Sequence, residues 1–229
     1  MKIKIKVENL SKDYISNEKV YNVLKNINIE IYDNELVSII GSSGAGKSTL
    51  LYILGTLEFA TQGKIIYTDK DNNNFDILQL KQKDLNLFRN KKVGFVFQFH
   101  HLLPEFNVIE NIMMPLYLSN DKITVEKERN ITEMMDFAQI ADLTKKMPSQ
   151  ISGGEQQRVA IIRALANNPE VIFADEPTGN LDSENSKLIL SLLKSLQKEL
   201  GITTVIATHS EYLAKESDRI IKISDGIII

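Results

Sequence analysis

Four short apolar runs along the chain predict buried strands. They span residues 36–40, 93–97, 171–174 and 203–208. Runs of this length with almost no polar side chain are typical of strands that are covered on both faces. Segments with helical periodicity separate the runs, and this alternation predicts a parallel α/β sheet.

The first part of the chain shows a different pattern, in which apolar and polar residues alternate. Ile3, Ile5 and Val7 alternate with charged residues, and a second such stretch lies at residues 24–31. Alternation of this kind predicts half-exposed strands. We therefore expect an N-terminal antiparallel β subdomain beside the buried strand at 36–40. Further strands are expected at 63–68 and in a C-terminal hairpin whose arms are residues 219–224 and 227–229.

Between about residues 99 and 160 the pattern is helical, and no strand is predicted. Helices are expected at 107–118 and 124–141, with Pro148 as the stop signal after the second. We interpret this part as a helical insertion in a single domain, whose α/β core comprises about residues 1–98 and 161–229. Outside the insertion, helices are expected at 78–90, 183–200 and 211–216.

Composition excludes several classes of protein. The chain has 229 residues, no cysteine and a formal net charge of −3. Without cysteine there is neither a disulfide nor a thiolate metal site, and the acidic balance predicts no nucleic-acid partner. The opening MKIKIKVENL lacks the apolar core of a signal peptide, and no run approaches the roughly 18 apolar residues that span a bilayer. A membrane role would therefore depend on other chains.

A glycine-rich segment, GSSGAGKST at residues 41–49, follows the first buried run and precedes a helical stretch. Strand, glycine-rich turn, Lys-Ser and helix form the context of a phosphate site, because glycine amides and a helix N-terminus both attract an anion. Lys47 is expected to reach the β- and γ-phosphates of a nucleotide, and Ser48 to hold Mg²⁺. The candidate binding residues are Gly41, Ser42, Ser43, Gly44, Ala45, Gly46, Lys47, Ser48 and Thr49.

A second glycine-rich segment, ISGGEQQR at 151–158, also opens a helix. Ser152 is a candidate N-cap, and Glu155 would complete a capping box with it. From the residues alone two interpretations stay open. The segment is either only a well-capped helix start or, with Gly153 and Gly154, a second anion-binding site.

Polar side chains follow three of the buried runs. Asp175 and Glu176 end the run at 171–174, His209 ends the run at 203–208, and Gln98 follows the run at 93–97. Ligands gather at the carboxyl ends of strands in open α/β sheets, so these side chains are candidates for chemistry. Asp175 fits a Mg²⁺-organising role and Glu176 the activation of a water, whereas the alternative is an acidic turn before a proline.

Tyr14 lies just past the first expected strand, where an aromatic ring either stacks on a base or packs as an ordinary tyrosine. The adjacent His100 and His101 are not expected to form a zinc site, since two ligands are too few. Residues 99–108 are either core of the insertion or a joint to a partner protein.

Together these motifs resemble those of an ABC-transporter ATPase subunit. In chain order they are residues 41–49 (Walker A), Gln98 (Q-loop), 151–158 (signature), 171–176 (Walker B), 179–182 (D-loop) and His209 (switch histidine). The resemblance covers the whole chain, with small departures at Ile151, where leucine is usual, and at Ser210, where aspartate is common. It implies a P-loop NTPase fold with a RecA-like parallel sheet core, and ATP and Mg²⁺ as cofactors.

The resemblance also implies a role for each motif. Tyr14 would stack on adenine, and Ser48, Gln98 and Asp175 would serve Mg²⁺ and the attacking water. Glu176 would polarise that water, and His209 would contact the γ-phosphate. Ser152, Gly153, Gly154 and Glu155 would face the nucleotide of a second copy in a head-to-tail dimer.

A finer resemblance lies in FQFHHLLPEF at 97–106, ALANNP at 164–169 and ADEPTGNLD at 174–182. These are similar to the LolD-type ATPases of lipoprotein-releasing LolCDE complexes. The similarity implies a peripheral subunit on the cytoplasmic face of the inner membrane, bound to integral membrane subunits of LolC/LolE type. MacB-like exporters and FtsE-like division ATPases share the third stretch and remain alternatives. A soluble ABC protein acting on ribosomes or DNA is disfavoured, since such proteins usually carry tandem ATPase units or long coiled coils.

Overall fold

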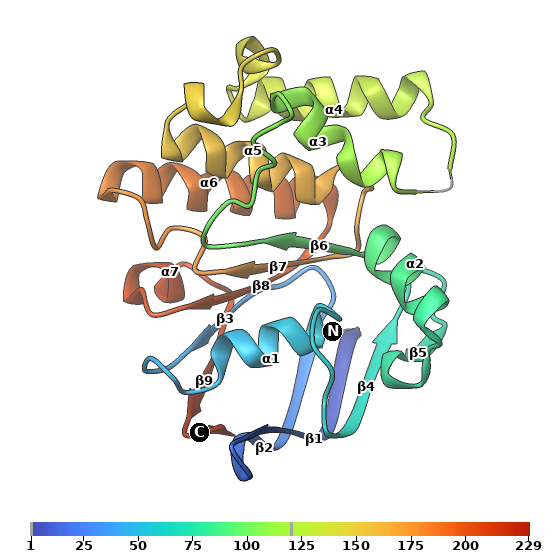
Figure 1. Cartoon of the computed structure of the whole chain (residues 1–229), viewed down its shortest axis with the longest axis vertical. Coiled ribbons are helices and arrows are strands. Elements are labelled where there is room, and N and C mark those ends of the chain that lie inside the picture. Colours follow the sequence, from blue (N-terminus) through green and yellow to red (C-terminus); the bar gives the residue numbers. More distant parts are fainter. Residues whose placement is uncertain (1, 120) are drawn as a thin grey trace.

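The computed structural model describes residues 2–119 and 121–229. Its central sheet has six strands in the order β10-β9-β3-β8-β7-β6, and the neighbours from β9 to β6 are parallel (Figure 1). The strands are β3 (Leu36–Ile40), β6 (Val93–Val96), β7 (Val171–Asp175), β8 (Thr203–Thr208), β9 (Arg219–Ser224) and β10 (Ile227–Ile228). The four apolar runs are confirmed as parallel strands. The C-terminal hairpin is also confirmed, but β9 additionally extends the parallel sheet beside β3.

The alternating strands form a sheet of their own, with the order β2-β1-β4-β5 and antiparallel neighbours. Its members are β1 (Ile3–Ser16), β2 (Lys19–Tyr32), β4 (Gln62–Thr68) and β5 (Asn74–Asp76). The antiparallel pairing is as expected, whereas the expectation that these strands lie directly beside β3 is wrong. An alternating strand has one apolar face to cover, and here that face packs in one cluster with α1 (Lys47–Leu54).

Most helices stand on the other side of the central sheet. In Figure 1 they are α3 (Val108–Tyr117), α4 (Val125–Phe137), α5 (Gly153–Leu165) and α6 (Ser183–Leu200). Their buried residues share a second core cluster. The remaining helices are α2 (Gln82–Lys92) and α7 (Glu211–Lys215), with short 3₁₀ turns at Ile77–Gln79, Ala141–Leu143 and Pro148–Gln150. Among the described residues, no helix is long and apolar enough to cross a bilayer.

The helix expected at 124–141 ends earlier, at Phe137. Gln139 adopts a left-handed backbone with φ of 55°, so the chain leaves the helix well before Pro148, which instead begins a 3₁₀ turn. Helix α5 begins inside the expected insertion and continues beyond residue 160 to Leu165 without interruption.

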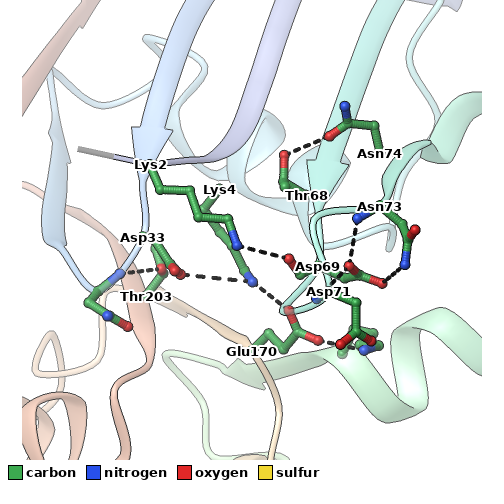
Figure 2. A network of polar contacts seen from close by, with 12 residues as sticks. Lys2, Lys4, Asp33, Thr68, Asp69, Asp71, Asn73, Asn74, Glu170 and Thr203 are labelled. Atoms are coloured by element: carbon green, nitrogen blue, oxygen red, sulfur yellow. Dashed lines mark hydrogen bonds and ion pairs between the residues drawn. The ribbon is translucent and has the colours of Figure 1, made fainter.

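Lys4 departs from the half-exposed pattern expected of the first strand. Only 2 % of its surface is exposed, because its ammonium group donates to Glu170 and lies 3.8 Å from Asp33 (Figure 2). Lys92 also donates to Glu170, with 2.5 Å between Nζ and Oε1. Burial alone would raise the pKa of Glu170, but the hydrogen bonds from the two lysines outweigh it and hold that pKa below its ordinary value. This buried network ties β1 to the residue that precedes β7.

Candidate active site

The first glycine-rich segment forms the loop between β3 and α1 and opens onto a cavity of about 490 Å³. The cavity is lined by Val23, Ser43, Gly44, Gly46, Lys47, Ser48, Thr49, Gln98, Glu176 and His209. Residues from five separate parts of the sequence therefore meet at one place, and the Walker A residues are joined there by Gln98, Glu176 and His209 as the motifs predict.

Two glycines in the loop adopt backbone conformations that other residues rarely take. Gly44 has φ of 78° and Gly46 has φ of 102°, and a Cβ on Gly46 would lie 2.9 Å from the Cδ2 atom of Leu24. Gly46 is also the N-cap of α1, whose first turn contains no acidic residue. The positive end of this helix is therefore available to an anion.

The ammonium group of Lys47 donates to the carbonyls of Gly41 and Ser42, each at 3.0 Å. The side chain is largely buried and folds back over the loop, so its charge lies at the cavity wall. A cation in that place would attract the phosphates of a nucleotide.

Ser48 and Asp175 are joined directly, since the Ser48 hydroxyl donates to Asp175 Oδ1 at 2.9 Å. Burial raises the pKa of Asp175, and the neighbouring Glu176 charge adds to that effect. Burial and a hydrogen bond to Asp175 likewise raise the pKa of the Tyr52 phenol to about 12. A cation at this point would relieve the unfavourable charge on Asp175.

Glu176 is held by the end of β8. Its Oε1 lies 2.8 Å from Nδ1 of His209, and its Oε2 accepts a hydrogen bond from Thr208 Oγ1 at 3.1 Å. The backbone of Glu176 is left-handed, with φ of 44°, which is uncommon outside glycine and costs of the order of 1 kcal/mol or more. The turn after β7 thus accepts backbone strain at the position where the carboxylate enters the cavity.

Gln98 follows β6, and its backbone carbonyl accepts a hydrogen bond from Asn180 Nδ2 at 3.2 Å. Further along the same loop, His101 packs its ring on Phe97, with the ring centroids 4.8 Å apart. In the part of the chain that the structure describes, no group of three or more His, Cys, Asp or Glu residues could hold a metal ion. A metal here would therefore depend on hydroxyl and amide oxygens besides carboxylates.

The second glycine-rich segment lies outside the cavity around Lys47. Ser152 caps α5, its hydroxyl accepting from the Glu155 amide at 3.3 Å, while Glu155 Oε2 accepts from the Ser152 amide at 2.6 Å. The Ser152 hydroxyl also donates to Glu155 Oε2 at 2.7 Å, and this hydrogen bond, followed by that of the Ser152 amide, holds the pKa of Glu155 below its ordinary value. The capping box is confirmed. None of Ser152, Gly153, Gly154 and Glu155 lines the cavity around Lys47.

Tyr14 does not line that cavity either. Its ring lies 4.6 Å from Nζ of Lys12, and its hydroxyl is 3.5 Å from Glu58 Oε2. Sequence reasoning missed Val23, which lines the cavity from β2, and Thr208, which holds Glu176. It placed Asn180 in the 179–182 motif but did not predict its hydrogen bond to Gln98. The register of β2 on β1 shifts next to Val23, and no local sequence signal reveals such a shift.

The family model described as "ABC transporter" matches residues 24–179, which include the loop, Gln98 and Glu176. The chain belongs to the ABC transporter family. As an ABC ATPase it binds and hydrolyses ATP, and its α/β core with an added antiparallel sheet is the cassette fold of that family.

Individual relatives agree with this assignment. This ABC ATPase is 43% identical over 97% of its length to "Lipoprotein-releasing system ATP-binding protein LolD" of Wigglesworthia glossinidia brevipalpis, covering 94% of that protein. It is 48% identical over 90% of its length to the protein of the same name from Bacteroides fragilis, covering 93% of it.

Solved structures give the same result. A dimeric structure of MJ0796, described as a bacterial ABC transporter cassette, superimposes with a TM-score of 0.86 and 40% identity, covering 98% of this chain and 96% of that chain. A second dimeric structure of MJ0796, in a post-hydrolysis state bound to ADP and Pi, matches equally well.

Proposed function

We propose that this ABC ATPase drives the release of lipoproteins from the inner membrane to a periplasmic carrier. The observation that carries the proposal is the likeness, over nearly the whole chain, to relatives called lipoprotein-releasing system ATP-binding protein. ATP hydrolysis belongs to the family, and its coupling to lipoprotein release is the proposed part.

In this proposal Glu176 is the general base of hydrolysis. Its carboxylate stands in the same cavity as Lys47 and is oriented by His209 and Thr208. It polarises the attacking water, while Lys47 binds the β- and γ-phosphates of ATP. His209, whose side chain is 70% exposed, contacts the γ-phosphate, and Gln98 positions the water.

Magnesium fits the oxygen donors of the cavity. The Ser48 hydroxyl, the Asp175 carboxylate and the Gln98 amide oxygen are hard ligands of the type that Mg²⁺ takes. Two of them, Ser48 and Asp175, already lie within hydrogen-bonding distance of each other. When bound, the ion neutralises charge on the phosphate oxygens.

We further propose that two copies pair head to tail. The Ser152–Glu155 end of α5 does not line the Lys47 cavity of its own chain, and among the described residues a Cβ on Gly153 would meet nothing closer than Leu181 at 3.8 Å. This open surface is available to the nucleotide of a second copy. The dimeric MJ0796 cassettes support such a pairing, and a two-fold dimer closes both sites at once.

Tyr14 remains a prediction for the adenine contact. Its ring is exposed on the β1–β2 hairpin, which also supplies Val23 to the cavity. The ring stands on the strand opposite Tyr21, so it can meet a base that extends from the phosphate site toward the hairpin.

Integral membrane subunits of LolC/LolE type would dock on the cytoplasmic side at residues 99–108. Phe99, Leu103 and Phe106 are exposed there, next to a cavity of about 310 Å³ that includes Phe97, His101 and Leu118. Exposed aromatic and aliphatic residues beside a hollow are typical of a partner site. In this proposal the helical insertion, about residues 99–160, begins at the same loop.

Co-purification tests the assignment. The Glu176→Gln variant, held in Mg-ATP, should be isolated from detergent-solubilised membranes with two related membrane proteins that have large periplasmic domains. Reconstituted with them, the wild-type chain should release a lipoprotein from vesicles to a soluble carrier, and Lys47→Ala should not. Recovery with one membrane protein fused to its own ATPase, or with cell-division proteins, would refute lipoprotein release.

A further inference from the structure

Arg163 joins two functional segments of this ATPase. It projects from α5, and its guanidinium donates through Nη1 to the carbonyl of His101 and through Nη2 to the carbonyl of His100, both at 2.6 Å. These carbonyls belong to the loop that begins at Gln98. The two donors of one planar fork therefore fix two consecutive peptide groups of that loop.

The environment of Arg163 is unusual for a charged side chain. Among residues 2–119 and 121–229, no carboxylate lies within ion-pair distance of it, and burial lowers its pKa. Taking a guanidinium out of water is costly unless its donors are satisfied. The side chain is half-buried, and the carbonyls of His100 and His101 accept hydrogen bonds from it. The position of the loop and the partial burial of the charge therefore depend on each other.

The same loop touches α5 near its other end. Burial lowers the pKa of His100, and the nearby Gln156 side chain on the first turn of α5 partly offsets this effect. Gln156 in turn donates to the carbonyls of Pro148, at 2.9 Å, and Ile151, at 3.3 Å, directly before Ser152. The loop is therefore hydrogen-bonded to the C-terminal part of α5 and lies near its first turn.

We propose that Arg163 is a positioning residue that makes the Gln98 loop and the Ser152 end of α5 move as one unit. This inference rests on the proposed head-to-tail dimer, in which Gln98 faces the chain's own nucleotide and Ser152 faces that of the second copy. A shift of Gln98 is then carried through His100, His101 and Arg163 to the surface that grips the other nucleotide. The two ATP sites of the dimer become dependent on one another through this contact.

Kinetics provide the first test, with Arg163→Met, Arg163→Lys and the control Arg129→Met. Arg129 stands on α4, where both it and its partner Glu133 are exposed, so its loss should be neutral. Arg163→Met should leave ATP affinity and KM unchanged but lower kcat by roughly 10–100-fold, because the catalytic parts are slightly misplaced. Arg163→Lys should have a kcat between those of the wild type and Arg163→Met, since an ammonium group does not bridge both carbonyls as a planar fork does.

A distance measurement separates positioning from a purely structural effect. The chain has no cysteine, so spin labels can be placed selectively at Phe99→Cys in the loop and Ser149→Cys before α5, both exposed positions. With Arg163 present, the label-to-label distance should stay narrow and unchanged when Mg-ATP is added to the Glu176→Gln background. With Arg163→Met, it should broaden or shift on adding Mg-ATP.

The outcomes are distinguishable. Wild-type kcat together with an unchanged distance in Arg163→Met would overturn the inference while leaving the proposed function intact. If Arg163→Met does not fold, as thermal unfolding would show, Arg163→Lys decides, and wild-type kcat in that variant would overturn the inference. If the Glu176→Gln chain with Arg163 intact does not dimerise in ATP, the proposed dimer is refuted instead.

Discussion

Glu176 and His209 are neighbours in the cavity, with 2.8 Å between Oε1 and Nδ1, although they come from the ends of two different strands. The parallel pairing of β7 with β8 brings those strand ends together, and Asp175 pairs with Ala207 in that register. The contact orients the carboxylate within the cavity. It also explains how a residue at a strained backbone position keeps one side-chain orientation.

Glu176→Gln is expected to lower ATP turnover by about 10²–10⁴-fold, the contribution of a positioned general base. The amide keeps the size of the side chain, so ATP binding should persist and the dimer should accumulate in Mg-ATP. Phosphate-release assays and size-exclusion chromatography would measure both. Glu211→Gln, an exposed acid on α7, is the matched control. Normal turnover in Glu176→Gln would remove the role given to this residue.

Lys47→Ala is expected to weaken nucleotide binding itself by roughly 10–100-fold, because hydrogen bonds to charged groups contribute about 1.5–3 kcal/mol. Equilibrium binding of ATP, followed by calorimetry, would measure the change. Lys64→Ala removes an exposed lysine from β4 and should bind ATP as the wild type does. An unaltered Kd in Lys47→Ala would contradict its placement at the phosphates.

Gly153→Ala and Gly154→Ala should separate dimer contacts from packing within one chain. A Cβ on Gly154 would lie 2.6 Å from Asn185 Oδ1, so this variant should lose stability as the Asn185 side chain is pushed out of its hydrogen bond to Asp182. A Cβ on Gly153 meets only open space and Leu181, so thermal unfolding of the monomer should be unchanged. Its ATP-dependent dimerisation should nevertheless fail. A fully active Gly153→Ala would show that this surface does not meet a nucleotide.

Asp175→Asn is expected to stabilise the nucleotide-free protein at neutral pH. Burial, assisted by Glu176, raises the folded-state pKa of Asp175 above its unfolded value, so ionising this group costs stability as pH rises through those two values. The gain in Tm should be present above the folded-state pKa and disappear below the unfolded value near 4. Melting curves from pH 3 to 8 would test this, and a gain that persists at pH 3 would contradict the assigned cause.

Glu170→Gln should be destabilising, because it takes from the buried Lys4 the carboxylate to which it donates and leaves only Asp33, at 3.8 Å, as an anionic neighbour in the described chain. Removing one member of a buried ion pair typically costs about 3–5 kcal/mol. Since the folded-state pKa of Glu170 is lowered, its contribution should be present above the unfolded pKa and be lost as pH falls through the folded one. Lys92→Met leaves the Lys4–Glu170 pair in place and should cost less. Urea unfolding would measure the loss in free energy of unfolding of each variant. Equal losses in Glu170→Gln and Lys92→Met would argue against the network.

The sequence predicted those features that depend on local pattern. The strand before Lys47 and the helix after it follow from a short apolar run and a glycine-rich turn, and Asp175 and Glu176 follow from the next such run. Lys4 was not predictable as buried, because its partner Glu170 is far away in the sequence. The same applies to Arg163, whose acceptors are backbone carbonyls that carry no residue-type signal. Contacts of this kind depend on tertiary structure, which alternation and spacing do not encode.

The hydrogen bond between Ser48 and Asp175 has a consequence for how fast the proposed magnesium site fills. Two of its oxygen donors are already adjacent across α1 and β7, so an incoming ion does not have to wait for the backbone to rearrange. Loading should then be limited by the loss of water from the ion's own hydration shell, which Mg²⁺ gives up reluctantly. A faster-dehydrating divalent ion such as Mn²⁺ would occupy the same ligands sooner.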